Sequence, residues 1–270
     1  MNTRGMAGRA TLALALCLFA VSAFAQATAT QKQYEPKVGQ AGKDVVWVPT
    51  SQELVNKMLD MAKVTPQDFV MDLGSGDGRT VITAAKRGAT AMGIEYNPDM
   101  VELSKRNAEK EGVTSKATFV KADLFETDLS KATVITMFLL PEINIKLRPK
   151  ILNLKPGTRV VSNSFTMEDW EADQTETVSG ECTSWCTALF WIVPAKVEGT
   201  WETPQGELKL TQEFQKVKGT LGSAKVEGKL RGDEITLTAG KTTYTGKVNG
   251  ASIKGTMKGD ASGAWTATKR

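Results

Sequence analysis

The residues with the clearest chemical potential are a glycine-rich run and three carboxylates, each placed where an apolar segment ends. The run Asp72-Leu-Gly-Ser-Gly-Asp-Gly78 follows a short apolar segment and precedes a helical pattern. Its glycines permit a sharp turn and a close approach of the backbone to a ligand, and the helix start offers unpaired N–H groups. Glu95 ends the next apolar segment, about 20 residues after Asp72, and Asp123 follows the third. Three acids at successive strand ends predict one nucleotide-cofactor site.

The types of these residues favour S-adenosylmethionine (SAM) over a nicotinamide dinucleotide. A dinucleotide site needs Gly-x-Gly-x-x-Gly and binds a pyrophosphate at the helix start, which a carboxylate at Asp77 would repel, whereas a sulfonium would suit it. Asp72 can hold the cationic methionine end of SAM, Glu95 the ribose hydroxyls and Asp123 the adenine amino group. The predicted cofactor residues are Thr50, Asp72, Gly74, Ser75, Gly76, Asp77, Glu95, Asp123 and Leu124.

These residues need a parallel sheet to bring them together, and residues 44–195 predict one. Short apolar runs alternate there with helical patterns, which is typical of βα units. A capping box at Thr50-Ser-Gln-Glu53 is expected to open a helix that runs to about Met61, and Glu142 and Asn144 are expected at another helix start. Strands are expected over residues 69–73, 91–95, 117–121, 132–138 and 159–163, with Val178 and residues 187–193 as a closing antiparallel pair.

Residues 196–270 have a different pattern. Segments such as Lys216-Val-Lys-Gly-Thr-Leu221 and Ser252-Ile-Lys-Gly-Thr-Met257 form a loose repeat, and apolar and polar residues alternate. This predicts an antiparallel meander of about six to eight short strands or a small barrel. Both a packed interior and a binding module are compatible with the pattern. The residues expected on its apolar face are Trp201, Leu208, Leu210, Phe214, Ile235, Leu237, Tyr244, Ile253 and Trp265.

The first 25 residues have the three parts of a secretory signal peptide. Arg4 and Arg9 precede an apolar stretch, and Ala23-Phe-Ala25 matches a cleavage site. The stretch is shorter than the roughly 20 residues that cross a bilayer, so we expect cleavage, no stable membrane span, and a periplasmic or secreted protein that begins near Gln26. Residues 26–43 are polar and predict a linker.

Composition excludes several classes of site. The chain has no histidine, so a Ser-His-Asp triad and a His-ligated metal are excluded, and no metal site is predicted. Its net charge of +4 falls to about +2 without the signal peptide, which is too little to indicate a nucleic-acid partner. In an oxidising compartment Cys182 and Cys186 could pair if a turn brings them together. Both the disulfide and the free thiols remain open.

Four motifs resemble a known family: Val48-Pro-Thr50, the run from Asp72 to Arg79, Gly93-Ile-Glu95 and Asp123-Leu-Phe125. They are similar to small class I SAM-dependent methyltransferases. That family includes bacterial enzymes and the mitochondrial lysine methyltransferases that act on the c-ring protein of ATP synthase and on the adenine nucleotide translocase. The resemblance implies a Rossmann-like fold, SAM as cofactor, and an acceptor channel beside Phe165 and Trp170.

We therefore expect an exported SAM-dependent methyltransferase that acts on a protein amine, with lysine as the acceptor. An amine that arrives deprotonated needs no protein base, which agrees with the absence of histidine. The alternatives are a non-catalytic SAM-binding or envelope-binding protein and a small-molecule methyltransferase. The sequence does not predict the oligomeric state. The predicted acceptor-site residues are Phe138, Asn163, Phe165 and Trp170.

Overall fold

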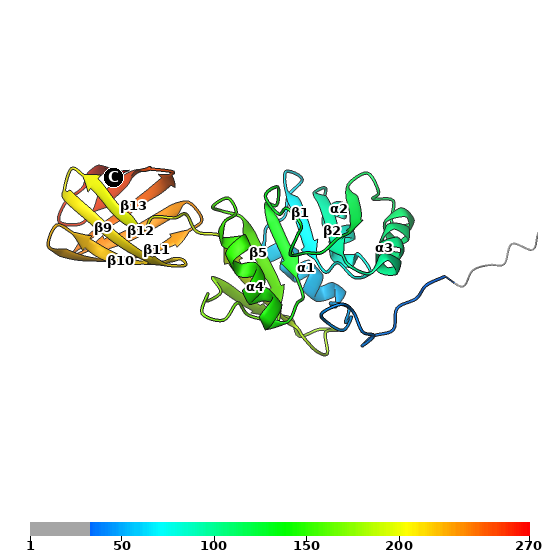
Figure 1. Cartoon of the computed structure of the whole chain (residues 1–270). Coiled ribbons are helices and arrows are strands. Elements are labelled where there is room, and N and C mark those ends of the chain that lie inside the picture. The colour runs from blue at the N-terminus through cyan, green and yellow to red at the C-terminus, as the bar shows by residue number, and fades with distance from the viewer. Residues whose placement is uncertain (1–32) are drawn as a thin grey trace, which may run out of the picture. The chain divides into compact units, whose positions relative to one another are not determined.

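Seven strands in the order β3-β2-β1-β4-β5-β7-β6 form one sheet in the first part of the described chain. The computed structural model describes residues 33–270, so the predicted signal peptide lies outside the described residues. Strands β1 to β5 run parallel, and β7 pairs antiparallel with β5 and β6 (Figure 1). This confirms the predicted Rossmann-like sheet. The strands are β1 Phe69–Leu73, β2 Thr90–Glu95, β3 Ala117–Lys121, β4 Val134–Met137, β5 Arg159–Asn163, β6 Gln174–Thr177 and β7 Thr187–Ile192.

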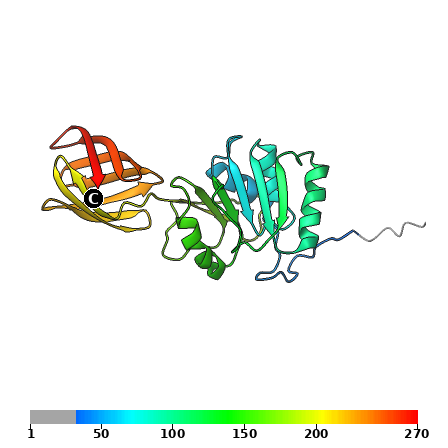
Figure 2. The same ribbon diagram turned by 45° about the horizontal axis from the view of Figure 1, so that its top comes forward.

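Four helices cover the two faces of this sheet. Helices α1 Gln52–Met61, α2 Arg79–Lys86 and α3 Pro98–Lys110 contribute to one apolar cluster. Helix α4 Pro141–Leu152 contributes to the other cluster, on the opposite face (Figure 2). We call α1 to β7 the sheet domain.

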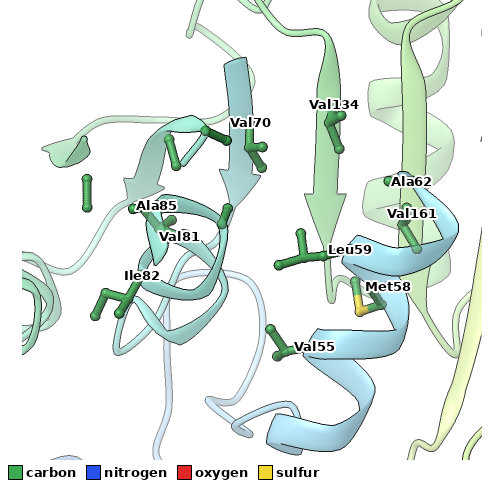
Figure 3. Close-up of a cluster of buried hydrophobic side chains, with 14 of the residues drawn as sticks. Val55, Met58, Leu59, Ala62, Val70, Val81, Ile82, Ala85, Val134 and Val161 are labelled. Carbon is green, nitrogen blue, oxygen red and sulfur yellow. The ribbon is translucent and has the colours of Figure 1, made fainter. Parts of the chain in front are cut away.

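Alternation along the strands explains the two clusters. Successive side chains of a strand point to opposite faces, and Val70 joins the α1 side whereas Met71 joins the α4 side. Figure 3 shows Val55 and Leu59 of α1 and Val81 of α2 packed over the strands. Because both faces are covered, the central strands β1, β4 and β5 are buried along nearly their whole length, which is typical of parallel sheets.

Helix α1 ends at Met61 as predicted, but its predicted cap and the predicted length of β4 are wrong, for local reasons. Helix α1 is capped by Ser51, whose hydroxyl accepts from the Leu54 N–H at 3.2 Å, so Thr50 and Glu53 form no capping box. The Glu53 carboxylate instead accepts from the Glu181 N–H at 3.0 Å. Strand β4 is shorter than residues 132–138, because the hydroxyl of Thr133 accepts from the Phe69 N–H and Phe138 turns toward a cavity described below.

Eight antiparallel strands close into a barrel after the sheet domain, as the sequence predicted. Closure is made by β15 and β8, where Thr268 pairs with Glu202 and Lys269 with Trp201. The strands are β8 Gly199–Thr203, β9 Gly206–Glu213, β10 Lys216–Leu221, β11 Ala224–Arg231, β12 Glu234–Ala239, β13 Thr242–Asn249, β14 Ser252–Lys258 and β15 Gly263–Lys269. Its interior is packed with apolar side chains.

The repeated glycines of the barrel mark places where neighbouring backbones come close. A Cβ atom built on Gly255 would lie 1.9 Å from the Thr245 carbonyl oxygen, and one on Gly219 would lie 1.8 Å from that of Lys209. No side chain fits at such a distance. The loose sequence repeat is therefore a repeated requirement of the strand packing.

Phe214 is the exception among the residues predicted to line the barrel. It lies in the turn between β9 and β10 with φ of 52°, so strand alternation does not place its side chain. Its ring stacks on Trp170 of the sheet domain, with centroids 6.0 Å apart. The prediction was wrong because the pattern of β9 does not continue into the turn. Within residues 33–270, the helices are too short or too polar to cross a membrane.

Candidate cofactor and acceptor site

A cavity of about 540 Å³ lies where strands β1, β2 and β4 end. The sheet order reverses between β1 and β4, and ligands of open α/β sheets bind at such a reversal, beyond the carboxyl ends of the strands. The cavity has the size of a typical small-molecule site. Eleven of the thirteen predicted site residues line it: Thr50, Asp72, Gly74, Ser75, Gly76, Asp77, Glu95, Asp123, Leu124, Phe138 and Phe165.

The glycine-rich loop forms the floor of the cavity because its backbone is left-handed. Gly76 has φ of 54°, and a Cβ atom there would lie 2.7 Å from the indole nitrogen of Trp47. Gly78 starts α2 with φ of 82°, where a Cβ atom would lie 2.7 Å from the ring of Phe119. A side chain at Gly76 would collide with Trp47, and one at Gly78 with Phe119 of β3, so these positions require glycine.

Asp72 is buried at the end of β1. Its carboxylate accepts a hydrogen bond of 2.6 Å from the hydroxyl of Thr136. Burial raises the pKa of Asp72 to about 7, and the negative charges of Asp77 and Glu95 add to the rise, whereas the hydrogen bond from Thr136 opposes it. A cation in the cavity would stabilise the ionised carboxylate. Asp72 is therefore prepared for a positively charged ligand.

Glu95 is fixed by two backbone N–H groups at the end of β2. One oxygen accepts from Gly76 at 3.0 Å and the other from Asn97 at 2.9 Å. These bonds connect the glycine-rich loop to the second strand. The carboxylate lines the cavity in a set orientation, with its remaining lone pairs free for hydroxyl donors.

Asp77 is not the free carboxylate that we expected to suit a sulfonium. It forms an ion pair with Arg79, at 2.6 Å between Nη2 and Oδ2. The same guanidinium donates to the Thr50 carbonyl at 2.8 Å. Arg79 therefore contacts both Asp77 in the glycine-rich loop and Thr50 before α1. Through this arginine, Asp77 connects the loop to the residues that precede α1.

Asp123 binds a lysine that the sequence analysis did not select. Its Oδ2 lies 2.6 Å from the Lys43 ammonium, and its Oδ1 accepts from the Phe125 N–H at 2.9 Å. The hydrogen bond from Lys43 is the main cause of a lowered pKa at Asp123. Lys43 belongs to a segment that we call the strap, residues 40–49, which lines the cavity along its length. The apolar run Val45-Val-Trp-Val48 is the sequence feature that could have indicated that this segment packs at the cavity.

Aromatic side chains line another part of the cavity. The rings of Phe138 and Phe165 stack with centroids 5.8 Å apart, and Trp185 lies 6.1 Å from Phe138. Trp185 stands inside the loop closed by a disulfide between Cys182 and Cys186, whose Cα atoms are 5.7 Å apart. The disulfide decides between the two states that the sequence left open.

The other two predicted acceptor-site residues do not line the cavity. Asn163 is fully buried and donates to the Thr50 hydroxyl at 3.2 Å, so it acts on the site by holding Thr50. The prediction for Trp170 is wrong, since it is fully buried between Trp191 and Phe214. Between Phe165, which lines the cavity, and Trp170 the chain turns at Glu168, with φ of 54°, and Trp170 lies away from the cavity wall.

The residues present fit SAM. The carboxylates that line the cavity can balance the charge of a cationic ligand, and the left-handed glycines leave room for it. The buried Ser75 hydroxyl has no hydrogen-bond partner within residues 33–270. A buried hydroxyl of this kind requires a partner. A ligand in the cavity would supply one.

Known proteins agree with this interpretation. The model of the ANTKMT methyltransferase domain matches residues 72–174. A protein-lysine N-methyltransferase of Saccharolobus islandicus is 50% identical over 129 residues, which are 47% of this chain and 80% of that protein. This chain belongs to the ANTKMT methyltransferase family. It is a methyltransferase that uses SAM, as the sequence motifs implied.

Two further relatives show how far the similarity extends. The adenine nucleotide translocase lysine N-methyltransferase of Mus musculus is 35% identical over 129 residues, which cover 47% of this chain and 56% of the mouse protein. The solved structure of an RNA methyltransferase from Salinibacter ruber, in complex with S-adenosyl-L-homocysteine, is 44% identical. Its TM-score is 0.52, and the match covers 56% of this chain and 96% of the other. These matches each account for about half of this chain.

Proposed function

We propose that this methyltransferase is exported and transfers methyl groups to lysine side chains of proteins. The observation that most directly supports methyl transfer to lysine is the shared cavity. The carboxylates of Asp72 and Glu95 and the aromatic rings of Phe138 and Phe165 line this one space. The relatives from Saccharolobus and mouse are named as lysine N-methyltransferases. Aromatic faces attract ammonium groups and pack against alkyl chains.

The chain's own residues would position the two reactants. When bound, SAM supplies a methyl group on a positively charged sulfur. Asp72 would balance the charge at the methionine end, Glu95 would accept from the ribose hydroxyls and Asp123 from the adenine amino group. The strap lines the cavity along its length and would limit the access of water to the reactants. Only the neutral amine is a nucleophile, so the acceptor would have to release its proton to solvent before the methyl group is transferred.

Radiolabelled methyl transfer tests the acceptor. The purified chain is incubated with methyl-labelled SAM and an envelope protein extract, and the labelled protein is hydrolysed to amino acids. We expect the label in methylated lysine, and its loss in Asp72→Ala but not in the barrel-surface control Lys254→Ala. Label in added RNA, as the name of the Salinibacter protein would suggest, or in small molecules would contradict the lysine acceptor. Saturable SAM binding with no transfer to any fraction would indicate a non-catalytic SAM-binding protein.

Fractionation of cells tests the export. The predicted signal peptide and the Cys182–Cys186 disulfide support it, because disulfides persist mainly in oxidising compartments. We expect the tagged protein in the periplasm or medium, beginning near Gln26 by N-terminal sequencing. A protein of full length in the cytoplasm would contradict the proposal, without affecting the lysine acceptor.

A further inference from the structure

The loop between β6 and β7 places a tryptophan in the site. Trp185 lines the cavity together with Phe138 and Phe165, although 45% of its surface is exposed. Its ring is tilted by 59° to that of Phe138. An indole ring this exposed gains less from burial than a core residue, so packing alone is a weak reason for its place.

The loop is built to hold this side chain. Trp185 has φ of 52°, a conformation that bulky residues rarely adopt unless the surroundings impose it. The Cys182–Cys186 disulfide closes the loop around it. The Glu53 carboxylate anchors the start of the loop by accepting from the Glu181 N–H. Backbone strain that is held by such constraints is typical of functional sites.

We propose that Trp185 determines acceptor specificity: with Phe138 and Phe165 it forms an aromatic surface that receives the alkylammonium end of the acceptor, and the disulfide loop positions it. This deepens the proposed function and rests on an amine as the acceptor. The chemical basis is the attraction of an ammonium to the π faces and the packing of its alkyl chain on the rings. Phe138 and Phe165 follow the ends of β4 and β5, so the loop adds a third side from a separate part of the chain.

Binding of a lysine-like probe tests this without any turnover. The full chain, labelled with ¹⁵N and saturated with S-adenosylhomocysteine, is titrated with n-butylammonium while the indole N–H signals are followed. The Trp185 signal is identified by its loss in Trp185→Phe. We expect this signal to shift saturably, with no shift at Trp265 in the barrel and none with the neutral control n-butanol. An unmoved Trp185 signal would overturn the proposal.

Three variants measure the contributions of the ring and of the loop. Trp185→Ala is expected to weaken n-butylammonium binding about fivefold, a loss within the range of a partly exposed cation–π contact, whereas Trp185→Phe restores most of it. The double variant Cys182→Ser with Cys186→Ser keeps the ring but frees the loop, and we expect a similar weakening. Unchanged affinity in Trp185→Ala would contradict the role of the ring, and unchanged affinity in the serine variant the role of the loop.

Failure of the proposed function gives a different result. SAM affinity of Trp185→Ala should equal that of the unmodified chain, because Trp185 is not a hydrogen-bond or ion-pair partner of Asp72, Glu95 or Asp123. If the probe binds at Trp185 but no lysine is methylated, the acceptor surface stands and lysine methylation fails. If lysine peptides are methylated, Trp185→Ala should raise their KM about fivefold and change kcat little, as expected for the loss of binding that the ground state and the transition state share.

Discussion

The sheet domain and the barrel differ in what they bury. The sheet domain buries polar and charged groups around its cavity, among them Asp72, Ser75 and Asn163. The buried polar residues of the barrel are Gln215 and Thr242, and a cavity lined by its strands measures about 10 Å³. A space of this size leaves room for little more than one water molecule. The comparison shows that the sheet domain gives up stability for a binding site, whereas the barrel interior is used for packing.

We expect the largest effect of any substitution at Asp72, where the burial of a charged group costs the most stability. Asp72→Asn keeps the shape of the side chain but removes the buried charge, so we expect SAM to bind about 100-fold more weakly. The protein without ligand should become more stable at pH 8, since an ionised carboxylate no longer needs to be buried beside Asp77 and Glu95. Calorimetry measures the affinity and denaturant titration the stability.

The control for Asp72→Asn is Asp260→Asn, which changes an exposed acid of the barrel. It should leave both SAM affinity and stability unchanged. If Asp72→Asn destabilised the protein at pH 8, the carboxylate would be a stabilising group and the contrast between the two regions would fail.

In the barrel we expect a loss of stability without a loss of binding. Gly255→Ala would place a Cβ atom 1.9 Å from the Thr245 carbonyl oxygen, and the strands would have to separate. We expect the unfolding free energy of the barrel to fall by about 3 kcal/mol, because overpacking a strand pair costs this much. SAM affinity should stay the same. The exposed neighbour change Lys254→Ala should alter stability by less than about 0.5 kcal/mol.

These two regions also differ in how well their sequence predicted them. The alternation of the barrel strands and the strand ends at Asp72, Glu95 and Asp123 were readable because each depends on local periodicity. Trp170 and Phe214 were misplaced because turns with left-handed backbone, at Glu168 and at Phe214 itself, redirected the chain.

Contacts between distant segments explain what the sequence analysis missed. Lys43 meets Asp123 across 80 positions of the chain, and Glu53 accepts from Glu181 across 128. Neither pairing has a local pattern. Trp185 was likewise overlooked, because the closed disulfide determines where its loop lies, and the sequence left that disulfide open.

A smaller effect is expected from pH. The pKa of Asp72 in the free protein is about 7, so the carboxyl is neutral below this pH and ionised above it. A cationic ligand binds the ionised form, and SAM affinity should therefore rise about tenfold between pH 6 and pH 8 and then level off. Calorimetry in buffers of different ionisation enthalpy should show proton release on binding near pH 7. Asp72→Asn should abolish the pH dependence.

The ionisation of Asp72 should also affect the stability of the ligand-free protein, but in the opposite direction to SAM affinity. Between about pH 4 and pH 7 the folded chain keeps a proton on Asp72 that the unfolded chain has lost, so this group lowers the unfolding free energy as pH rises through that window. Saturation with SAM should reduce the decline, because the ligand lowers the folded pKa. If the unfolding free energy of Asp72→Asn declined in the same way with pH, another titrating group would be responsible for the decline.

The smallest effect is expected at the ion pair between the strap and the sheet domain. Lys43 and Asp123 are both partly exposed, with 35% and 28% of their side chains accessible, and pairs of this kind contribute little because water and salt screen them. Lys43→Met should weaken SAM binding less than about threefold at low salt, and the difference should vanish in 1 M salt. Lys57→Met, at a partly exposed position of α1, serves as the matched control and should have no effect at either salt concentration. A large loss that persists in high salt would mean that Lys43 holds the strap by more than charge, and the cavity wall formed by residues 40–49 would then depend on this one contact.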